Sequence, residues 1–172
     1  TEIDSMIEAS GCKLCALLLT HGHFDHIKDA QSVRDKYKVP IYANSNEKEL
    51  LNNSHLNMSD EYGMDIHFDA DIWLEDGQSL ELAGIKLKAI HTPGHTKGGC
   101  CYYIEAADML MSGDTLFACS VGRTDFPTGS MSDIVRAIKE KLFVLPDNTR
   151  VFPGHGESTS ISYEKINNPF CQ

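Results

Sequence analysis

"LLLTHGHFDHIKDA", residues 17–30, places three histidines and two aspartates directly after an apolar run. Side chains two apart in an extended segment point the same way, so His21, His23 and Asp25 are expected to face one side of the loop. A helix that begins at Asp25 or His26 would turn His26 toward a second centre, and Asp25 could also serve as its N-cap. So many imidazole and carboxylate groups in so few positions predict two neighbouring metal ions rather than one.

Hydrophobic periodicity around this stretch alternates between helix and strand, which is typical of an α/β layer fold. Apolar residues at helical spacing and apolar runs bounded by glycine, proline or serine place the remaining elements. The expected helices cover residues 2–9, 27–37, 44–51 and a segment capped by Ser130 or Ser132 that ends before Pro146. The expected strands lie at residues 15–19 and 39–43, in turn-separated runs between 72 and 90, and at 100–104, 109–112 and 150–152.

Three later stretches share one pattern, a strand that ends in a tight glycine turn carrying a ligand-type residue. They are HTPGHTKGG with His95, MLMSGDTLF with Asp114 and RVFPGHGES with His155. Ligands on strand-end loops converge at one edge of a sheet. Each residue alone could be an ordinary turn residue, and their joint occurrence carries the inference. The histidines interpreted as structural or surface residues are His55, His67 and His91.

Composition bounds the class of protein. A chain of 172 residues with 41% hydrophobic content has the size of one ordinary domain. Its net charge of -10 argues against a nucleic-acid partner, and no apolar run is long enough for a membrane helix. The cysteines, including the pair Cys12 and Cys15, are interpreted as reduced structural thiols, with Cys100 and Cys101 on opposite faces of a strand. The default location is therefore the cytoplasm.

The motifs THGHFDH, HTPGHT, SGDTLF and FPGHG, in this order, resemble the metallo-β-lactamase superfamily and specifically its glyoxalase II-like thioesterase branch. The resemblance implies an αββα sandwich over residues 1–172 as one domain. The family's opening strands are absent ahead of the first helix. The chain ends at Gln172, so we also expect no helical C-terminal domain of the kind that binds glutathione. The sequence resembles the small single-domain relatives of glyoxalase II more than glyoxalase II itself.

The same resemblance implies a dinuclear site of two divalent metal ions, with zinc as first choice and iron or manganese as possible substitutes. The implied ligand sets are His21, His23 and His95 for one metal, Asp25, His26 and His155 for the other, and Asp114 as the bridge. The expected activity is hydrolysis of a small-molecule thioester of the hydroxyacylglutathione type by a metal-activated hydroxide. Asp25 is expected to relay a proton in addition to binding metal.

Arg123, in the motif GRTDF, follows the bridging aspartate and is expected to overhang the metals. The resemblance implies that it anchors the anionic part of the substrate, whereas an ordinary surface salt bridge would also explain an arginine here. Asp125 stands where glyoxalase II has a tyrosine, which argues against glutathione as the thiol.

Different activities fit parts of the pattern. The motif GRTDF also occurs in persulfide dioxygenases, which would hold one iron through His21, His95 and Asp114. A lactonase would use the same dinuclear site, and a zinc module without catalytic activity would use the same ligands. The presence of His155 in a Pro-Gly-His-Gly turn favours the dinuclear hydrolase.

Overall fold

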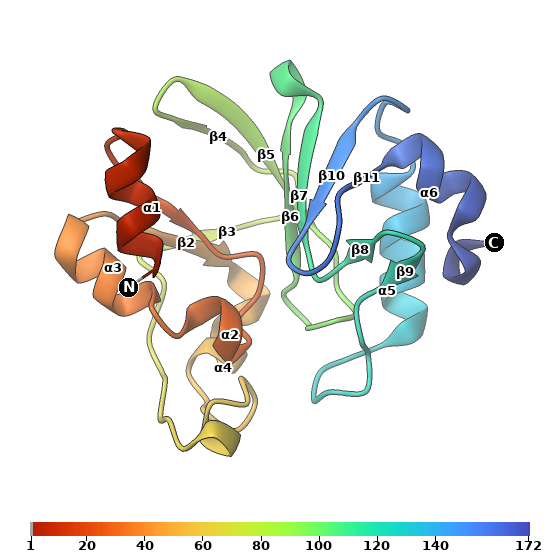
Figure 1. Ribbon diagram of the computed structural model, residues 1–172. Coiled ribbons are helices and arrows are strands. Elements are labelled where there is room, and N and C mark those ends of the chain that lie inside the picture. The colour runs from red at the N-terminus through yellow and green to blue at the C-terminus, as the bar shows by residue number, and fades with distance from the viewer. Residues whose placement is uncertain (1) are drawn as a thin grey trace.

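The computed structural model describes residues 2–172 as two facing β-sheets with helices on both outer sides, the αββα arrangement (Figure 1). One sheet has the strand order β1-β2-β3, and the larger sheet has the order β11-β10-β7-β6-β5-β4. The strands are β1 (Leu17–Leu18), β2 (Ile41–Asn44), β3 (Ile72–Leu74), β4 (Ser79–Leu82), β5 (Ile85–His91), β6 (Cys100–Ile104), β7 (Met109–Gly113), β8 (Leu116–Phe117), β9 (Ser120–Val121), β10 (Arg150–Pro153) and β11 (Thr159–Ser160).

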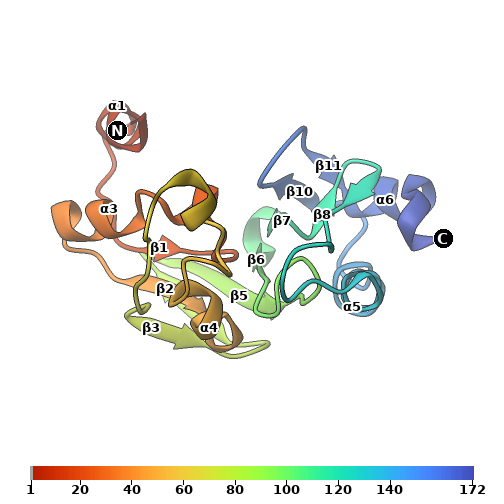
Figure 2. The same cartoon turned by 90° about the horizontal axis from the view of Figure 1, so that it is seen from below.

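The helices cover the outer face of each sheet. Helices α2 to α4 lie beside the smaller sheet, whereas α5 and α6 lie beyond the larger one (Figure 2). The helices are α1 (Glu2–Ser10), α2 (Phe24–Ile27), α3 (Ala30–Tyr37), α4 (Lys48–Leu51), α5 (Met131–Ala137) and α6 (Ile161–Asn167), with a 3-10 turn η1 (Ser45–Glu47) before α4 and a π-helical turn η4 (Ile138–Leu142) after α5. None of the helices formed by residues 2–172 is both long and apolar enough to cross a membrane.

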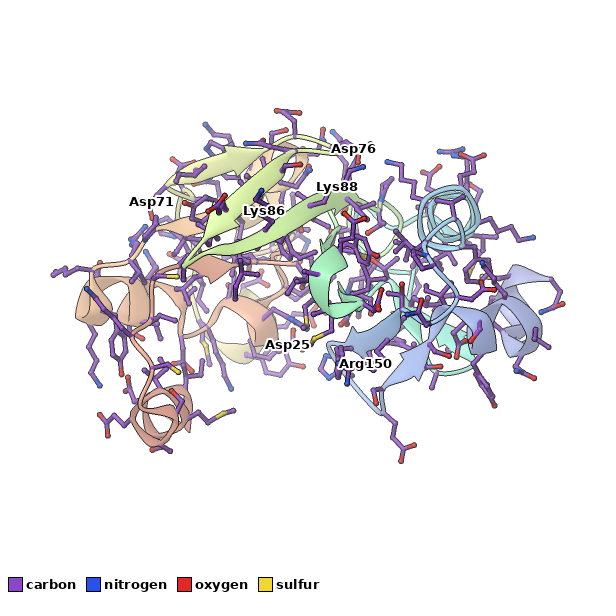
Figure 3. The ribbon with its side chains drawn as sticks, turned by 90° about the horizontal axis from the view of Figure 1, so that it is seen from above. Asp25, Asp71, Asp76, Lys86, Lys88 and Arg150 are labelled. Atoms are coloured by element: carbon purple, nitrogen blue, oxygen red, sulfur yellow. The ribbon has the colours of Figure 1, made fainter. Side chains whose placement is uncertain are left out.

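Three apolar clusters hold the layers together. One packs α2 to α4 on the smaller sheet, one fills the space between the sheets, and one packs α5 and α6 on the larger sheet. Cys100 belongs to the middle cluster and Cys101 to the outer one, so the prediction that they face opposite ways is confirmed. On β5 the exposed Lys86 and Lys88 alternate with the buried Leu87, as the period of a strand requires (Figure 3).

Strand register brings the segments that carry ligand-type residues to one edge. Strands β1 and β2 pair in parallel, as do β7 and β10, while β5, β6 and β7 form consecutive antiparallel pairs. The turns that follow β1, β5, β7 and β10 therefore meet at the line where the two sheets approach each other. Asp25 lies there, between the two halves of the molecule (Figure 3).

The expected elements are present with shifted ends, and three differences matter. The helix expected over residues 27–37 is divided into α2 and α3, because Asp29 becomes the N-cap of a second helix and its carbonyl accepts from the Val33 N–H. The helix from Ser130 continues as a π-helical turn to Leu142. The small hairpin β8–β9, strand β11 and helix α6 were not predicted, since their segments lack a long apolar period.

Candidate metal centre

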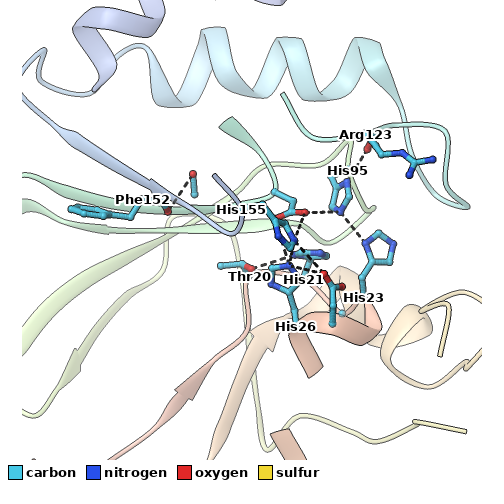
Figure 4. Close-up of polar contacts among 12 residues, drawn as sticks. Thr20, His21, His23, His26, His95, Arg123, Phe152 and His155 are labelled. Atoms are coloured by element: carbon cyan, nitrogen blue, oxygen red, sulfur yellow. Dashed lines mark hydrogen bonds and ion pairs between the residues drawn. The ribbon is translucent and has the colours of Figure 1, made fainter. Parts of the chain in front are cut away.

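The structure brings the histidines and aspartates of all four motifs into one cluster (Figure 4). His21 and His23 follow β1, His95 follows β5, Asp114 follows β7 and His155 follows β10. Each of these side chains lies just after the end of a strand, and all of these strand ends are at the same edge. The expected convergence of the five residues is therefore confirmed.

The first group consists of His21, His23 and His95, whose donor atoms lie within 4.8 Å of one another. All three side chains are buried. His23 Nδ1 lies 2.9 Å from His95 Nε2, and the His21 and His95 ring centroids are 4.7 Å apart. This group is therefore enclosed by protein.

The second group consists of Asp25, His26 and His155, whose donor atoms also lie within 4.8 Å of one another. His155 Nε2 is 3.2 Å from Asp25 Oδ2 and 3.3 Å from His26 Nε2. The side chains of His155 and Asp25 are 59% and 39% exposed. This group therefore faces solvent.

Asp114 lies between the two groups. Its carboxylate has one oxygen 3.6 Å from His95 Nε2 and 3.6 Å from His155 Nε2, and the other oxygen 3.5 Å from His26 Nε2. Gly154 packs against Asp114 and His26 so closely that a Cβ there would collide with both side chains. The glycine before His155 thus lets β10 approach the cluster.

The structure corrects one expectation about the opening stretch. Asp25 does not share a side with His21 and His23, because α2 begins at Phe24 and the two-residue alternation ends there. His23 occupies the N-cap position, so Asp25 is not the cap and lies in the first turn. Asp25 consequently points with His26 toward the second group, as the family resemblance implied.

Burial sets the electrostatics of the first group. Desolvation, with neighbouring imidazoles adding to it, lowers the pKa of His21, and it lowers the pKa of His23 to about 3. Desolvation also lowers the pKa of His95, against the opposing hydrogen bond to Arg123. These rings are therefore neutral at pH 7, which is the form that binds metal.

A backbone carbonyl fixes the tautomer of His95. Its Nδ1–H donates to the Arg123 carbonyl over 2.7 Å, which leaves the Nε2 lone pair directed into the cluster (Figure 4). Such a bond from the far nitrogen is typical of histidines that ligate metals.

The donor set fits divalent metal ions. His21 Nε2 and Asp114 Oδ1 are buried without a hydrogen-bond partner among residues 2–172, an arrangement that costs about 1–3 kcal/mol per group if it stays unsatisfied. A coordinated cation would satisfy such atoms. Imidazole and carboxylate ligands suit zinc, iron and manganese.

A cavity of about 230 Å³ opens over the cluster. Its walls are largely aromatic: the Phe24 and Tyr62 rings stack 3.9 Å apart on one side, and Phe126 stands beside His23 on the other. The lining residues are His23, Phe24, Asp25, Met58, Tyr62, His95, Asp114, Arg123, Phe126 and His155. The sequence prediction missed the apolar walls, because Met58 and Tyr62 lie on a polar segment that resembled a plain surface excursion.

Arg123 lines this cavity, as expected, but its charge is already paired. Its Nε and Nη2 donate to the two Asp125 oxygens over 3.0 and 2.8 Å, and its guanidinium lies 4.2 Å from the Phe126 ring centre. The hydrogen bonds from Arg123 lower the pKa of Asp125. The alternative of an ordinary salt bridge is therefore confirmed, whereas the anchoring of an anionic substrate stays a prediction.

The histidines assigned to structural or surface roles lie outside the cluster. His91 donates from Nε2 to the Lys97 carbonyl, while His55 and His67 pair with nearby surface aspartates.

Comparison with known proteins agrees with this arrangement. A family model of the metallo-beta-lactamase superfamily matches residues 3–155. The chain is 39% identical over 171 residues to the probable metallo-hydrolase YqgX of Bacillus subtilis, across 98% of this chain and 81% of that protein. It is 34% identical over 168 residues to the hydroxyacylglutathione hydrolase GloC of Haemophilus influenzae, across 95% and 79% of the two proteins.

Two solved structures have the same fold as this chain. The BLEG-1 B3 metallo-beta-lactamase superimposes with a TM-score of 0.93 at 36% identity, over 99% of this chain and 83% of that chain. TTHA1623, solved in a di-iron-bound form, superimposes with a TM-score of 0.88 at 31% identity, over 98% and 83%.

Proposed function

The chain belongs to the metallo-beta-lactamase superfamily, and from that premise we propose that this metallo-hydrolase holds two divalent metal ions and cleaves a small-molecule thioester. The single observation that carries the proposal is the position of Asp114, whose carboxylate lies within 3.6 Å of His95 and His155, members of different groups. A carboxylate between two sets of imidazoles is well placed to be shared by two metal ions. The di-iron form of a structure 31% identical to this chain supports two ions.

In this proposal each group holds one ion, with Asp114 shared between them and zinc as the first choice. When bound, a pair of divalent ions supplies Lewis acidity that polarises a carbonyl and brings the pKa of water toward neutrality. The chain's own contribution is to fix the donors: buried imidazoles on one side, the Arg123 carbonyl that orients His95, and Gly154 that lets β10 approach.

Asp25 is the proposed proton acceptor. Its Oδ2 lies 3.2 Å from His155 Nε2 at the rim of the cavity, where a 39% exposed side chain can exchange protons with solvent. The expected result for Asp25→Asn is a loss of turnover of about 10²-fold or more, typical of removing a general base. Turnover is measured alongside metal content. A variant with full metal content and full turnover would contradict this role.

Two features support a thioester as the substrate: the ease with which a thiolate leaves and the aromatic walls of the cavity. A thiol has a pKa near ~8.5, so it departs as thiolate with little need of a general acid. Aromatic walls formed by Phe24, Tyr62 and Phe126 suit an apolar acyl or thiol portion. The hydroxyacylglutathione hydrolase GloC, 34% identical to this chain, supports the same bond type. The pairing of Arg123 with Asp125 argues for a thiol less anionic than glutathione.

The direct test is a panel of thioesters and lactones assayed with the metal-loaded chain, with oxygen consumption recorded in parallel. We expect thiol release from thioesters bearing an apolar group, and slower release from those bearing glutathione. Turnover of lactones without turnover of thioesters would contradict the proposed thioester class and identify the chain as a lactonase. If a chain that holds one iron consumes oxygen with a persulfide, the reaction is that of a persulfide dioxygenase and not hydrolysis.

A further inference from the structure

We propose that Glu47, which is not a member of the cluster, is a positioning residue that holds the two loops of the first group at the separation a metal ion requires. The inference rests on the proposed metal site. It concerns the segment η1, which the sequence prediction treated only as the start of a helix.

The Glu47 side chain is buried, with 1% of the residue exposed. Its Oε1 accepts from the Gly22 N–H over 2.8 Å, and its Oε2 accepts from the Thr96 hydroxyl over 3.1 Å. Carboxylate oxygens accept both bonds, and hydrogen bonds to a charged acceptor are roughly twice as strong as neutral ones.

The partners of Glu47 belong to the two ligand loops: one is the Gly22 backbone N–H, and the other is the Thr96 side-chain hydroxyl. Gly22 lies between His21 and His23, and Thr96 directly follows His95. The two loops are far apart in sequence, so this carboxylate joins them across the cluster. A shift of either loop would change the distance between His23 Nδ1 and His95 Nε2, now 2.9 Å.

Close packing shows that the site is built around the carboxylate. A Cβ at Gly98 would collide with the Glu47 backbone nitrogen and with its Oε2. At the preceding turn, the Asn44 side chain accepts from the Asn46 N–H and fixes the start of η1. Burial raises the pKa of Glu47, whereas its hydrogen bonds oppose that rise. The donors to this buried carboxylate, as far as residues 2–172 show them, belong to the two ligand loops, so the bonds that offset its desolvation also fix those loops.

Glu164 provides a matched control within the same chain. It is fully buried, and it accepts from the Cys119 N–H over 3.0 Å, from the Thr159 hydroxyl over 2.6 Å and from Asn168 Nδ2 over 2.9 Å. These bonds join α6 to the turn between β8 and β9 and contact no member of either metal group. The two carboxylates are therefore both buried and hydrogen-bonded through both oxygens, but they differ in the segments that they join.

The test compares Zn²⁺ affinity in wild type, Glu47→Gln and Glu164→Gln, measured by chelator competition and by NMR of the histidine rings, with the melting temperature of each. We expect Glu47→Gln to weaken Zn²⁺ binding at the His21, His23 and His95 rings by roughly 10–100-fold, the usual cost of losing an outer-shell partner. Binding at the His26 and His155 rings should stay at the wild-type level, and Glu164→Gln should lower only the melting temperature.

Unchanged Zn²⁺ affinity in folded Glu47→Gln, or an equal loss of affinity in Glu164→Gln, would overturn the inference while leaving the proposed function intact. If Glu47→Gln does not fold, Thr96→Val decides, because it removes one donor and keeps the carboxylate. Weaker binding at the first group supports the inference, and unchanged binding overturns it. Wild-type rings that do not respond to Zn²⁺ at all would overturn the proposed function, and the inference with it.

Discussion

The two halves of the cluster, three histidines in one and an aspartate with two histidines in the other, lie in opposite surroundings. His21, His23 and His95 are at most 5% exposed and belong to loops cross-linked by buried hydrogen bonds. Asp25 and His155 have side chains 39% and 59% exposed, on a short helix and on a turn after a strand. One half is therefore preorganised by the fold and the other is open to solvent, so under the proposed function we expect the first half to bind metal more tightly.

Breaking the buried half should have the largest effect. His23→Asn removes a ligand from the first group and leaves its neighbours without a cation, so we expect loss of that ion and a fall in hydrolysis on the order of a thousand-fold. Metal content and thioester turnover are measured together. His67→Asn, which changes an exposed histidine outside the cluster, is the control and should match wild type. Retained turnover in His23→Asn would remove the first group from the mechanism.

Breaking the exposed half should have a smaller effect on metal binding. His155→Asn leaves the first group intact, so we expect its ion to survive dialysis while the second ion is lost. Hydrolysis should fall by about 10²-fold, less than for His23→Asn. Loss of both ions from His155→Asn would show that the two halves bind metal ions cooperatively. It would contradict the expectation that the buried half has the higher metal affinity.

Acid should reveal the cost of burying imidazoles. The pKa of His23 is lowered to about 3 in the folded state, and an unfolded histidine has its usual pKa near ~6.5. As pH falls from about 6.5 toward 3, His23 becomes protonated in the unfolded chain but stays neutral in the folded chain. The free energy of unfolding therefore decreases. For His23 alone the loss between pH 7 and pH 5 is about 2 kcal/mol. Metal-free protein is unfolded with urea at both pH values, and a slope that His23→Asn leaves unchanged would contradict this account.

The salt bridge at the rim of the cavity should give the smallest effect on catalysis. Asp125→Asn frees the Arg123 guanidinium, so KM for a thioester with a carboxylate on its thiol portion should fall by roughly two- to five-fold. A neutral thioester should be unaffected. Asp133→Asn removes the partner of another exposed arginine, Arg136, away from the cavity, and it should change neither KM. Equal changes for both substrates would exclude a role of Asp125 in selecting charge.

The convergence of the cluster residues was predictable because their types and spacings appear directly in the sequence. His21 and His23 follow a strand, while His95, Asp114 and His155 each occupy a glycine turn. The division into two halves was harder to predict from residue alternation. It depends on α2 beginning at Phe24, where the Phe24 N–H donates to the Asn57 carbonyl, a contact between segments distant in sequence.

Features beyond the ligands needed the tertiary structure. Tyr62 became a cavity wall only because its segment folds back to stack on Phe24. Glu47 carries no sequence signal, since a glutamate at the start of a helix is ordinary and its partners Gly22 and Thr96 are remote. The α/β class, in contrast, followed from hydrophobic periodicity, and the αββα sandwich followed from the family resemblance.

The most direct test of a dinuclear hydrolase is the number of metal ions per chain in protein purified without added metal, measured with thiol release from the same sample. The account predicts two divalent ions per chain, with thiol release that falls when either ion is withdrawn by a chelator and returns when it is restored. A single iron per chain, with oxygen consumed and no thiol released from any thioester, would contradict it.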